Sequence, residues 1–351
     1  MSPNDYEARR ARLEPLLQSA RTLVDPATER GREAREQLLR SSGLSIQGVE
    51  LALSRCLETE PSEREVEALI RGTATAQVAH VLLSANVFVA AHRAIAIGLA
   101  ASDTVCVRPS RREPEMAELL LSGAPNAFQL VSELAPHSGD RVWAYGSDET
   151  LDEIAVTLPP GVAFHGHGTG FGVAVLDGQL GQSSIEEALA LLAEDVALFD
   201  QRGCLSPRVL LVIGGPPAAR EIAEALAHAL GALEERIPRG ELEPAEAAQI
   251  SRFRDTAHYA GEVFSAGLGF VSAGNDERWL LPPTGRNVHV LPSADPVRTL
   301  TPFGPLITSC AFAGDPALGS ALRRALPRAR SADFGAMQRP PFDGPVDRRE
   351  A

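Results

Sequence analysis

The strongest candidate for a nucleophile in this 351-residue chain is Cys204, in the string F-D-Q-R-G-C-L-S-P at residues 199–207. A helix-like segment ends near Phe199, Gly203 permits a tight turn, and the apolar run at 209–213 predicts a strand. A thiol on such a turn can attack a carbonyl carbon while its own backbone N–H faces the oxyanion that forms. Most single cysteines are small buried hydrophobic residues, so the surrounding motifs must decide between nucleophile and core residue.

A second pair of candidates is His165 and His167 in the string F-H-G-H-G. Residues two apart on a strand point to the same side, so the two imidazoles can act together. They can serve as a base, face a cofactor or bind a metal. A catalytic zinc needs a third ligand, and the ligand spacing of metallo-hydrolases does not continue here, so the sequence predicts no metal site.

The composition excludes several chemistries, because all 33 basic residues are arginines and the chain has no lysine. Schiff-base aldolases, pyridoxal-phosphate enzymes and P-loop kinases in their usual form all need a lysine. The net charge of −13, with arginines scattered among acidic residues, argues against a nucleic-acid partner. Codon bias in a GC-rich genome explains most of the lysine-to-arginine replacement.

The sequence also bears on the cellular compartment and on membrane insertion. The four cysteines form no C-x-x-C pair, and the charged first residues lack the apolar core of a signal peptide, so we expect a reduced, cytoplasmic protein. Residues 72–92 carry no formal charge, but they include several polar side chains. We therefore expect a buried strand and helix there and no membrane span.

The elements that would position these residues follow from hydrophobic periodicity. Residues 6–70 have the pattern of several short helices. Farther along, apolar runs predict strands at 78–83, 104–107, 128–131, 142–145, 172–176, 209–213 and 288–291. Amphipathic segments between them predict helices at 89–101, 114–122, 148–157, 184–199 and 218–233. This alternation is typical of the α/β class with parallel sheets.

Five blocks, taken in order, resemble the acyl-CoA reductase (LuxC-type) family of the aldehyde dehydrogenase superfamily. They are S-A-N-V at 84–87 with V-C-V-R-P-S at 105–110, A-Y-G-S-D-E-T at 144–150, F-H-G-H-G at 164–168, D-Q-R-G-C-L-S-P at 200–207 and P-F-G-P-L at 302–306. Each block is a weak signal by itself, and their common order makes them specific together.

The resemblance implies an aldehyde-dehydrogenase-like fold with its active site in the crevice between two domains. We expect N-terminal helices and a Rossmann-like NAD(P)-binding domain over residues 1–180, and a catalytic α/β domain over 181–331. The Pro-rich, charged residues 332–351 predict a mobile tail. The β-hairpin through which superfamily members oligomerise is not recognisable, so a homo-oligomer is expected from the resemblance alone.

The resemblance also implies a reaction: NADPH-dependent reduction of a fatty acyl-CoA to the aldehyde through an acyl group on Cys204. Asn86 would donate its side-chain N–H to the oxyanion. Oxidising relatives carry a glutamate that activates water, whereas no carboxylate lies between Phe164 and Leu176 here. Its absence favours reduction or transfer over oxidation to the acid.

The expected cofactor residues are Arg108, Ser110, Arg111, Gly146, Ser147, His165, His167 and Phe303. Arg108 stands where the family pattern has a lysine. Together with the neighbouring arginines it favours NADPH over NADH, because a guanidinium suits a 2′-phosphate. Thr301 replaces another cofactor residue, a glutamate. Two alternatives remain open: a catalytically weak binding or scaffold subunit, and a reductase of acyl phosphates or of acyl groups on a carrier protein.

Overall fold

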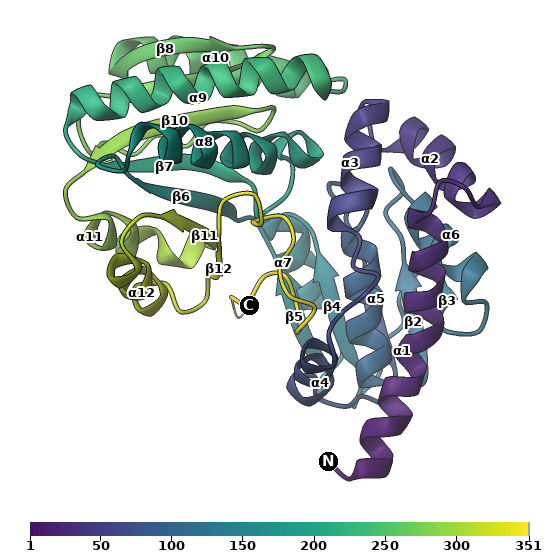
Figure 1. Cartoon of the computed structure of the whole chain (residues 1–351). Coiled ribbons are helices and arrows are strands. Elements are labelled where there is room, and N and C mark those ends of the chain that lie inside the picture. Colours follow the sequence, from purple (N-terminus) through teal and green to yellow (C-terminus); the bar gives the residue numbers. More distant parts are fainter. Residues whose placement is uncertain (350–351) are drawn as a thin grey trace.

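The computed structural model describes residues 1–349 and consists of two α/β units that lie side by side (Figure 1). The first unit is built on a five-stranded sheet with the order β3-β2-β1-β4-β5, in which every paired strand is parallel. Its strands are β1 (Ala79–Leu82), β2 (Val105–Arg108), β3 (Gln129–Leu130), β4 (Arg141–Tyr145) and β5 (Ala163–His167). The predicted α/β class with parallel sheets is thus confirmed.

Four helices precede this sheet, as the pattern of residues 6–70 predicts. They are α1 (Pro3–Val24), α2 (Glu29–Ser41), α3 (Ile46–Cys56) and α4 (Glu63–Gly72). Each begins at a serine or threonine whose side chain accepts a backbone N–H of the first turn. They pack with α5 (Ala90–Ala101) and α6 (Glu115–Gly123) in one core on one face of the sheet, and α7 (Asp148–Thr157) packs on the other face.

The second unit is built on a seven-stranded sheet with the order β12-β11-β6-β7-β10-β9-β8. Only the β8–β9 pair is antiparallel among the described strands. The strands are β6 (Phe171–Asp177), β7 (Pro207–Ile213), β8 (Gly261–Ala266), β9 (Gly269–Gly274), β10 (Asn287–Ser293), β11 (Ile307–Ala313) and β12 (Arg330–Ala332). The apolar runs at 172–176, 209–213 and 288–291 correspond to β6, β7 and β10.

Helices cover both faces of the second sheet (Figure 1). Along β6, Ala174 and Leu176 pack against one face's helices, whereas Val173 and Val175 pack into the core on the opposite face. The first face carries α8 (Gln182–Ala197) and α9 (Pro216–Arg236); the second carries α11 (Pro296–Leu300), the 3₁₀ turn η2 (Thr301–Leu306) and α12 (Pro316–Ala325). Helix α10 (Pro244–Ala260), which no prediction anticipated, precedes the β8–β9 hairpin.

The domain boundary expected after residue 180 lies earlier in the structure. Strand β6 pairs with β7 and β11 of the second sheet, so the chain passes between the units at residues 168–170. The apolar run of β6 identifies a buried parallel strand but carries no information about which sheet it joins, because pairing partners are distant in sequence. No helix of residues 1–349 is long and apolar enough to cross a membrane.

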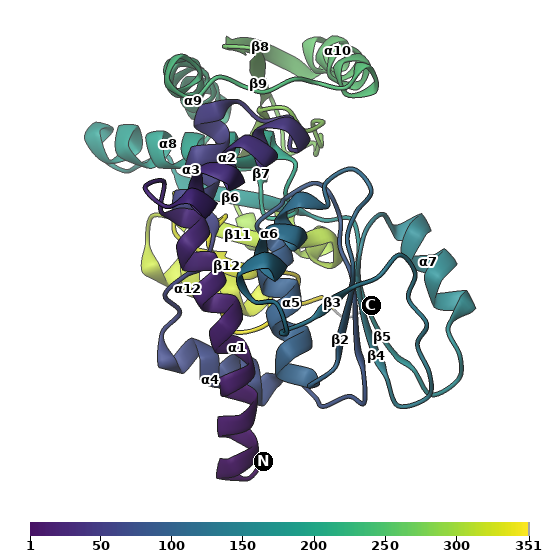
Figure 2. The ribbon, with the colours of Figure 1, turned by 90° about the vertical axis from the view of Figure 1, so that its right-hand side faces the viewer.

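The expected mobile tail is the clearest correction. Within residues 332–349 the chain packs against both units, and Phe342 is only 1% exposed. This segment crosses from the second unit to the first (Figure 1, Figure 2), where Arg93 of α5 binds the carbonyls of Pro340 and Pro341. Its charged and proline-rich composition resembles that of a tail, but its charges form specific ion pairs and its two aromatic side chains, Phe334 and Phe342, are buried. Residues 350–351 of the predicted tail lie outside the described residues.

Candidate active site

Cys204 lies on a tight turn immediately before β7. The N–H of Ser206 donates to the Gly203 carbonyl at 3.1 Å, which closes the turn. The backbone N–H groups of Cys204 and Leu205 favour the thiolate, because they lower the pKa of the thiol against the rise that burial causes. Two β11 hydroxyls hold the turn from behind: Thr308 donates to the Cys204 carbonyl, and Ser309 donates to the Leu205 carbonyl at 2.8 Å. The turn agrees with the one that the sequence predicts at Gly203, and it leaves the Cys204 side chain half-buried.

The three residues that precede this turn have an unusual backbone. Phe199, Asp200 and Gln201 have φ angles of 55°, 50° and 67°, in the left-handed region that side chains other than glycine rarely adopt. Such a conformation costs about 1–2 kcal/mol per residue. A segment of this kind persists only where its surroundings hold it, and strained backbone of this sort gathers at functional sites.

Gln201 supplies part of that restraint from a fully buried position. Its Nε2 donates to the carbonyls of Pro207 at 2.8 Å and Asn287 at 2.7 Å, and its Oε1 accepts the N–H of Asn287 at 2.8 Å. The amide thus ties the Cys204 loop to the first residues of β7 and β10. These contacts give a physical reason for the glutamine three residues before the cysteine.

The carboxyl ends of the strands in the first sheet bring most of the other candidates to one edge. The register pairs Leu82 with Arg108 across β1 and β2, and Tyr145 with His167 across β4 and β5. The segments that follow these strands therefore lie along one edge, which is where open α/β sheets bind ligands. They carry Asn86, Arg108, Ser110, Arg111, Gly146, Ser147 and His167.

The loop that carries Asn86 faces the Cys204 turn. A β-carbon added at Gly203 would lie 3.2 Å from Cγ2 of Val87, and the rings of Phe88 and Phe199 meet edge to face with centroids 5.8 Å apart. Asn86, next to Val87, is exposed. Contacts on both sides of Cys204 thus join the edge of the first sheet to the start of β7.

The two histidines occupy different places, although both lie on β5. His167 ends the strand, stacks on Tyr145 at 4.7 Å and is 9% exposed, and neither ring nitrogen has a hydrogen-bond partner within residues 1–349. Burial lowers its pKa to about 4, so its imidazole is neutral at neutral pH. His165 lies in mid-strand, stacks on Trp143 and is 3.1 Å from Arg141.

The remaining candidates are Ser110 and Ser147, at the edge of the first sheet, and Phe303, in the second unit. Ser110 accepts the N–H of Arg112 at 3.2 Å, and Ser147 caps α7 by accepting the N–H of Thr150 at 3.3 Å. Phe303 lies in the second unit, where it stacks on Trp279 at 4.1 Å. The structure thus gathers the strand-end residues, whereas His165 and Phe303 have contacts within their own units.

The sequence profile described as Acyl-CoA reductase (LuxC) matches residues 125–339. The chain belongs to this acyl-CoA reductase family. The family makes it an oxidoreductase, and it confirms the resemblance found in the motifs. No curated protein matches the chain.

Solved structures support the fold of this acyl-CoA reductase. Lactaldehyde dehydrogenase from Escherichia coli is 13% identical with a TM-score of 0.69, over 96% of this chain and 80% of that one. The NAD-dependent benzaldehyde dehydrogenase of Corynebacterium glutamicum is 15% identical with a TM-score of 0.69, over 99% and 88% of the two chains. At this identity the likeness establishes an aldehyde-dehydrogenase-like fold.

The sequence analysis missed the C-terminal residues that this reductase brings to the crevice. Arg349 donates to the carbonyls of Thr169 at 2.9 Å and Pro305 at 3.1 Å, and it is paired with the buried Asp347. Burial and then the Asp347 carboxylate raise the pKa of Cys204 to about 12, while Arg349 opposes them. The two phenylalanines of this charged segment, Phe334 and Phe342, were the available signal.

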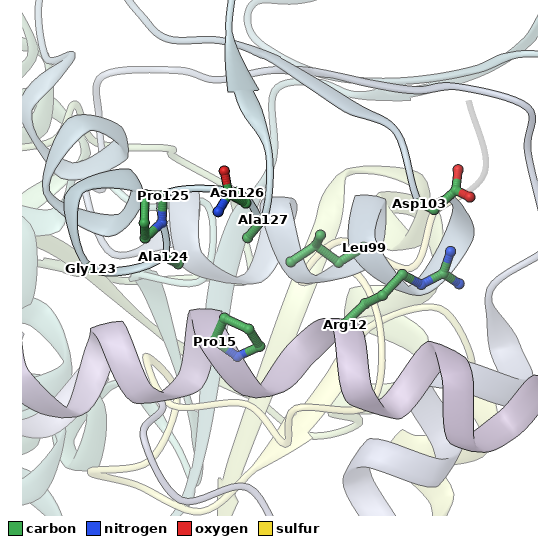
Figure 3. A pocket seen from close by; sticks show the side chains of 9 residues that line it. All are labelled: Arg12, Pro15, Leu99, Asp103, Gly123, Ala124, Pro125, Asn126 and Ala127. Atoms are coloured by element: carbon green, nitrogen blue, oxygen red, sulfur yellow. The ribbon is translucent and has the colours of Figure 1, made fainter.

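The cavity in Figure 3 lies elsewhere, between α1, α5 and the loop at 123–127. Its volume is about 340 Å³, and Arg12 and Asp103 lie on its wall with mostly apolar neighbours. None of the candidate residues lines it. Within residues 1–349 no group of three histidine, cysteine or acidic side chains is arranged to hold a metal ion.

Proposed function

We propose that the protein reduces an acyl-CoA to the corresponding aldehyde, with NADPH as the reductant and Cys204 as the site of acylation. One observation carries the proposal: the thiol turn, with its two backbone donors, meets the Asn86 loop at the carboxyl edge of the first sheet. The family supplies the thioester substrate class. Reduction of a thioester through an acylated cysteine needs a nucleophile and oxyanion donors at the same place.

The steps balance with the residues at hand. The Cys204 thiolate attacks the thioester carbonyl, and the bond to the CoA sulfur breaks, so CoA leaves as a thiolate. A nicotinamide bound at the carboxyl edge of the first sheet would supply the hydride that reduces the acyl group. Cys204 would then leave as a thiolate while the aldehyde is released. Backbone N–H groups and the Asn86 amide stabilise both oxyanions, each donor contributing roughly 2.7–4 kcal/mol.

His167 is suited to positioning the cofactor for these steps. As a neutral imidazole it offers one N–H and one lone pair, and both ring nitrogens lack a partner within the described residues. A buried side chain with unpaired polar atoms at a crevice is suited to a ligand's polar groups. We assign His167 to the cofactor's polar edge.

The preference for NADPH rests on the edge of β2. The guanidinium of Arg108 forms no hydrogen bond or ion pair within residues 1–349, and Arg111 is exposed. The nearest following carboxyl group, Glu113, is buried and accepts the N–H of Met116 at 2.9 Å. Burial raises its pKa to about 7. This edge therefore offers arginines to a 2′-phosphate instead of the carboxylate that usually binds a free ribose hydroxyl.

The decisive experiment is mass spectrometry of the protein after mixing with acyl-CoAs of graded chain length. An acyl adduct on the Cys204 peptide, absent from Cys204→Ala, supports the proposal. NADPH oxidation with release of free CoA should be lost in the same variant. The absence of any adduct, with the fold intact, would refute acylation at Cys204.

A further inference from the structure

The segment that follows β12 ties the two units together. Its start is fastened to the second unit, where buried Asp195 accepts the N–H groups of Gly335 at 2.6 Å and Met337 at 3.0 Å. Gln338 donates to Ser206 at 2.9 Å, and a β-carbon on Gly203 would lie 3.2 Å from its Oε1. The segment therefore packs directly against the turn that carries Cys204.

The middle of the segment is clamped to the first unit by Arg93. This guanidinium, 2% exposed, donates to the carbonyls of Pro340 at 2.7 Å, Pro341 at 2.6 Å and Gly344 at 3.0 Å. Glu58 forms an ion pair with the same guanidinium. The ring of Phe342 packs beneath Arg93 at 5.2 Å. Because Arg93 is buried, these contacts fix residues 340–344 to the first unit.

The last described residues join the connection between the units to the second unit. Arg349 donates to the carbonyls of Gly168 at 3.3 Å and Thr169 at 2.9 Å, between β5 and β6, and to that of Pro305 at 3.1 Å in η2. A β-carbon at Gly170 would lie 2.5 Å from Cγ2 of Thr308 and 2.7 Å from Nη2 of Arg349. Since Thr308 bonds to the Cys204 carbonyl, Arg349 lies one side chain away from the nucleophile's backbone.

We propose that residues 347–349 form a plug beside Cys204, and that this plug moves aside to admit the acyl thioester. This rests on the proposed role of Cys204. Arg330, 4% exposed, donates to the carbonyl of Val346 at 2.9 Å and to that of Pro345, so the anchored part of the segment ends at Val346. Arg349 ties the residues beyond it to the carbonyls of Gly168, Thr169 and Pro305. The plug can leave while the contacts of Arg93 and Arg330 stay closed.

The charged groups at the end of the plug favour the protonated, unreactive form of Cys204. Burial and the Asp347 carboxylate raise the pKa of Cys204 to about 12, so the thiol stays protonated while the plug is seated. Arg349 forms an ion pair with Asp347 and holds it in the crevice. Departure of the plug removes the Asp347 carboxylate from the neighbourhood of the half-buried thiol.

The test is the rate at which iodoacetamide alkylates Cys204, measured by peptide mass mapping, since this readout needs neither acyl-CoA nor NADPH. A chain that ends at Val346 keeps the three carbonyls that Arg93 binds and the two that Arg330 binds. We expect its Cys204 to react about tenfold faster or more, because reactivity follows exposure and thiolate fraction. Arg349→Ala should give a smaller increase in the same direction, and it carries the test if the shortened chain does not fold.

The matched control is Arg339→Ala, which removes an exposed guanidinium from the same segment outside the crevice. Its alkylation rate should equal that of the unaltered protein. Equal rates in all variants would overturn the plug. Faster alkylation without any acyl adduct from acyl-CoA would leave the plug standing and refute the proposed function. An acyl adduct together with unchanged alkylation rates would support the proposed function and refute the plug.

Discussion

The guanidinium of Arg286 is paired with the carboxylate of Asp200, with Nε 3.0 Å and Nη2 2.8 Å from Oδ1, and both side chains are 2% exposed. Glu234 neutralises the other side of the guanidinium at 3.0 Å. The second oxygen of Asp200 accepts the N–H of Gly240 at 2.9 Å, and its carbonyl accepts that of Gly285 at 3.1 Å. This buried pair therefore restrains the left-handed segment that leads to Cys204.

Breaking that pair should destabilise the protein strongly. Arg286→Leu leaves the Asp200 carboxylate buried without its cation, which costs about 3–5 kcal/mol in comparable sites. Denaturant unfolding measures this loss. The exposed pair Arg278–Asp276, with side chains 69% and 58% exposed, is the control, and Asp276→Asn should change stability by less than about 1 kcal/mol. Similar losses in the two variants would contradict the restraining role of the pair.

Asn86→Ala should lower the rate of Cys204 acylation by about 10²–10³-fold, since it removes one oxyanion donor. The exposed position of Asn86 means that the fold should be little affected. Single-turnover mixing with acyl-CoA, followed by mass spectrometry, measures the acylation step by itself. Asn86→Asp is the informative companion, because a carboxylate of nearly the same shape repels the oxyanion. Acylation at the unaltered rate in both variants would exclude Asn86 from the oxyanion site.

The low pKa of His167 makes stability depend on acid pH. Its pKa falls from 6.5 to about 4 on folding, so the unfolded chain binds a proton in this range that the folded chain does not. The free energy of unfolding should therefore fall as pH decreases from about 6.5 toward 4, by at most ~1.4 kcal/mol per unit for this group. His289 adds a parallel contribution, because burial also lowers its pKa to about 4.

His167→Gln should reduce that pH slope, leaving the share of His289. Denaturant titrations at a series of pH values measure it. Replacement of the exposed His258 by glutamine reports any general effect of losing a histidine. A slope unchanged by His167→Gln would show that this imidazole is protonated in the folded protein.

Arg108→Leu should raise the KM for NADPH by about tenfold or more and leave the KM for NADH nearly unchanged, because only NADPH presents a 2′-phosphate to the guanidinium. Steady-state kinetics with both nucleotides measure this, and NADH is the internal control. Equal losses with the two nucleotides would assign Arg108 to a part that they share. A preference of the unaltered protein for NADH would refute the proposed cofactor.

Much of the molecule could be predicted from local pattern. Apolar runs identify the central strands because parallel strands buried on both faces need continuous apolar side chains. The glycine before Cys204 and the strand after it predict the nucleophile's turn, since turn chemistry is also local. The strand-end motifs around Arg108 and Ser147 meet at one edge because parallel strands align their carboxyl ends.

Other features were decided by contacts between distant residues, which periodicity does not encode. Pairing with β7 and β11 assigns β6 to the second sheet, and strand register separates His167 at the crevice from His165 in mid-strand. The C-terminal segment has a tail's composition, yet Arg93, far earlier in the chain, binds three of its carbonyls. The sequence by itself determined the central strands and the turn that carries Cys204, and the tertiary structure decided which remote segments pack around that turn, because burial arises only when such segments meet.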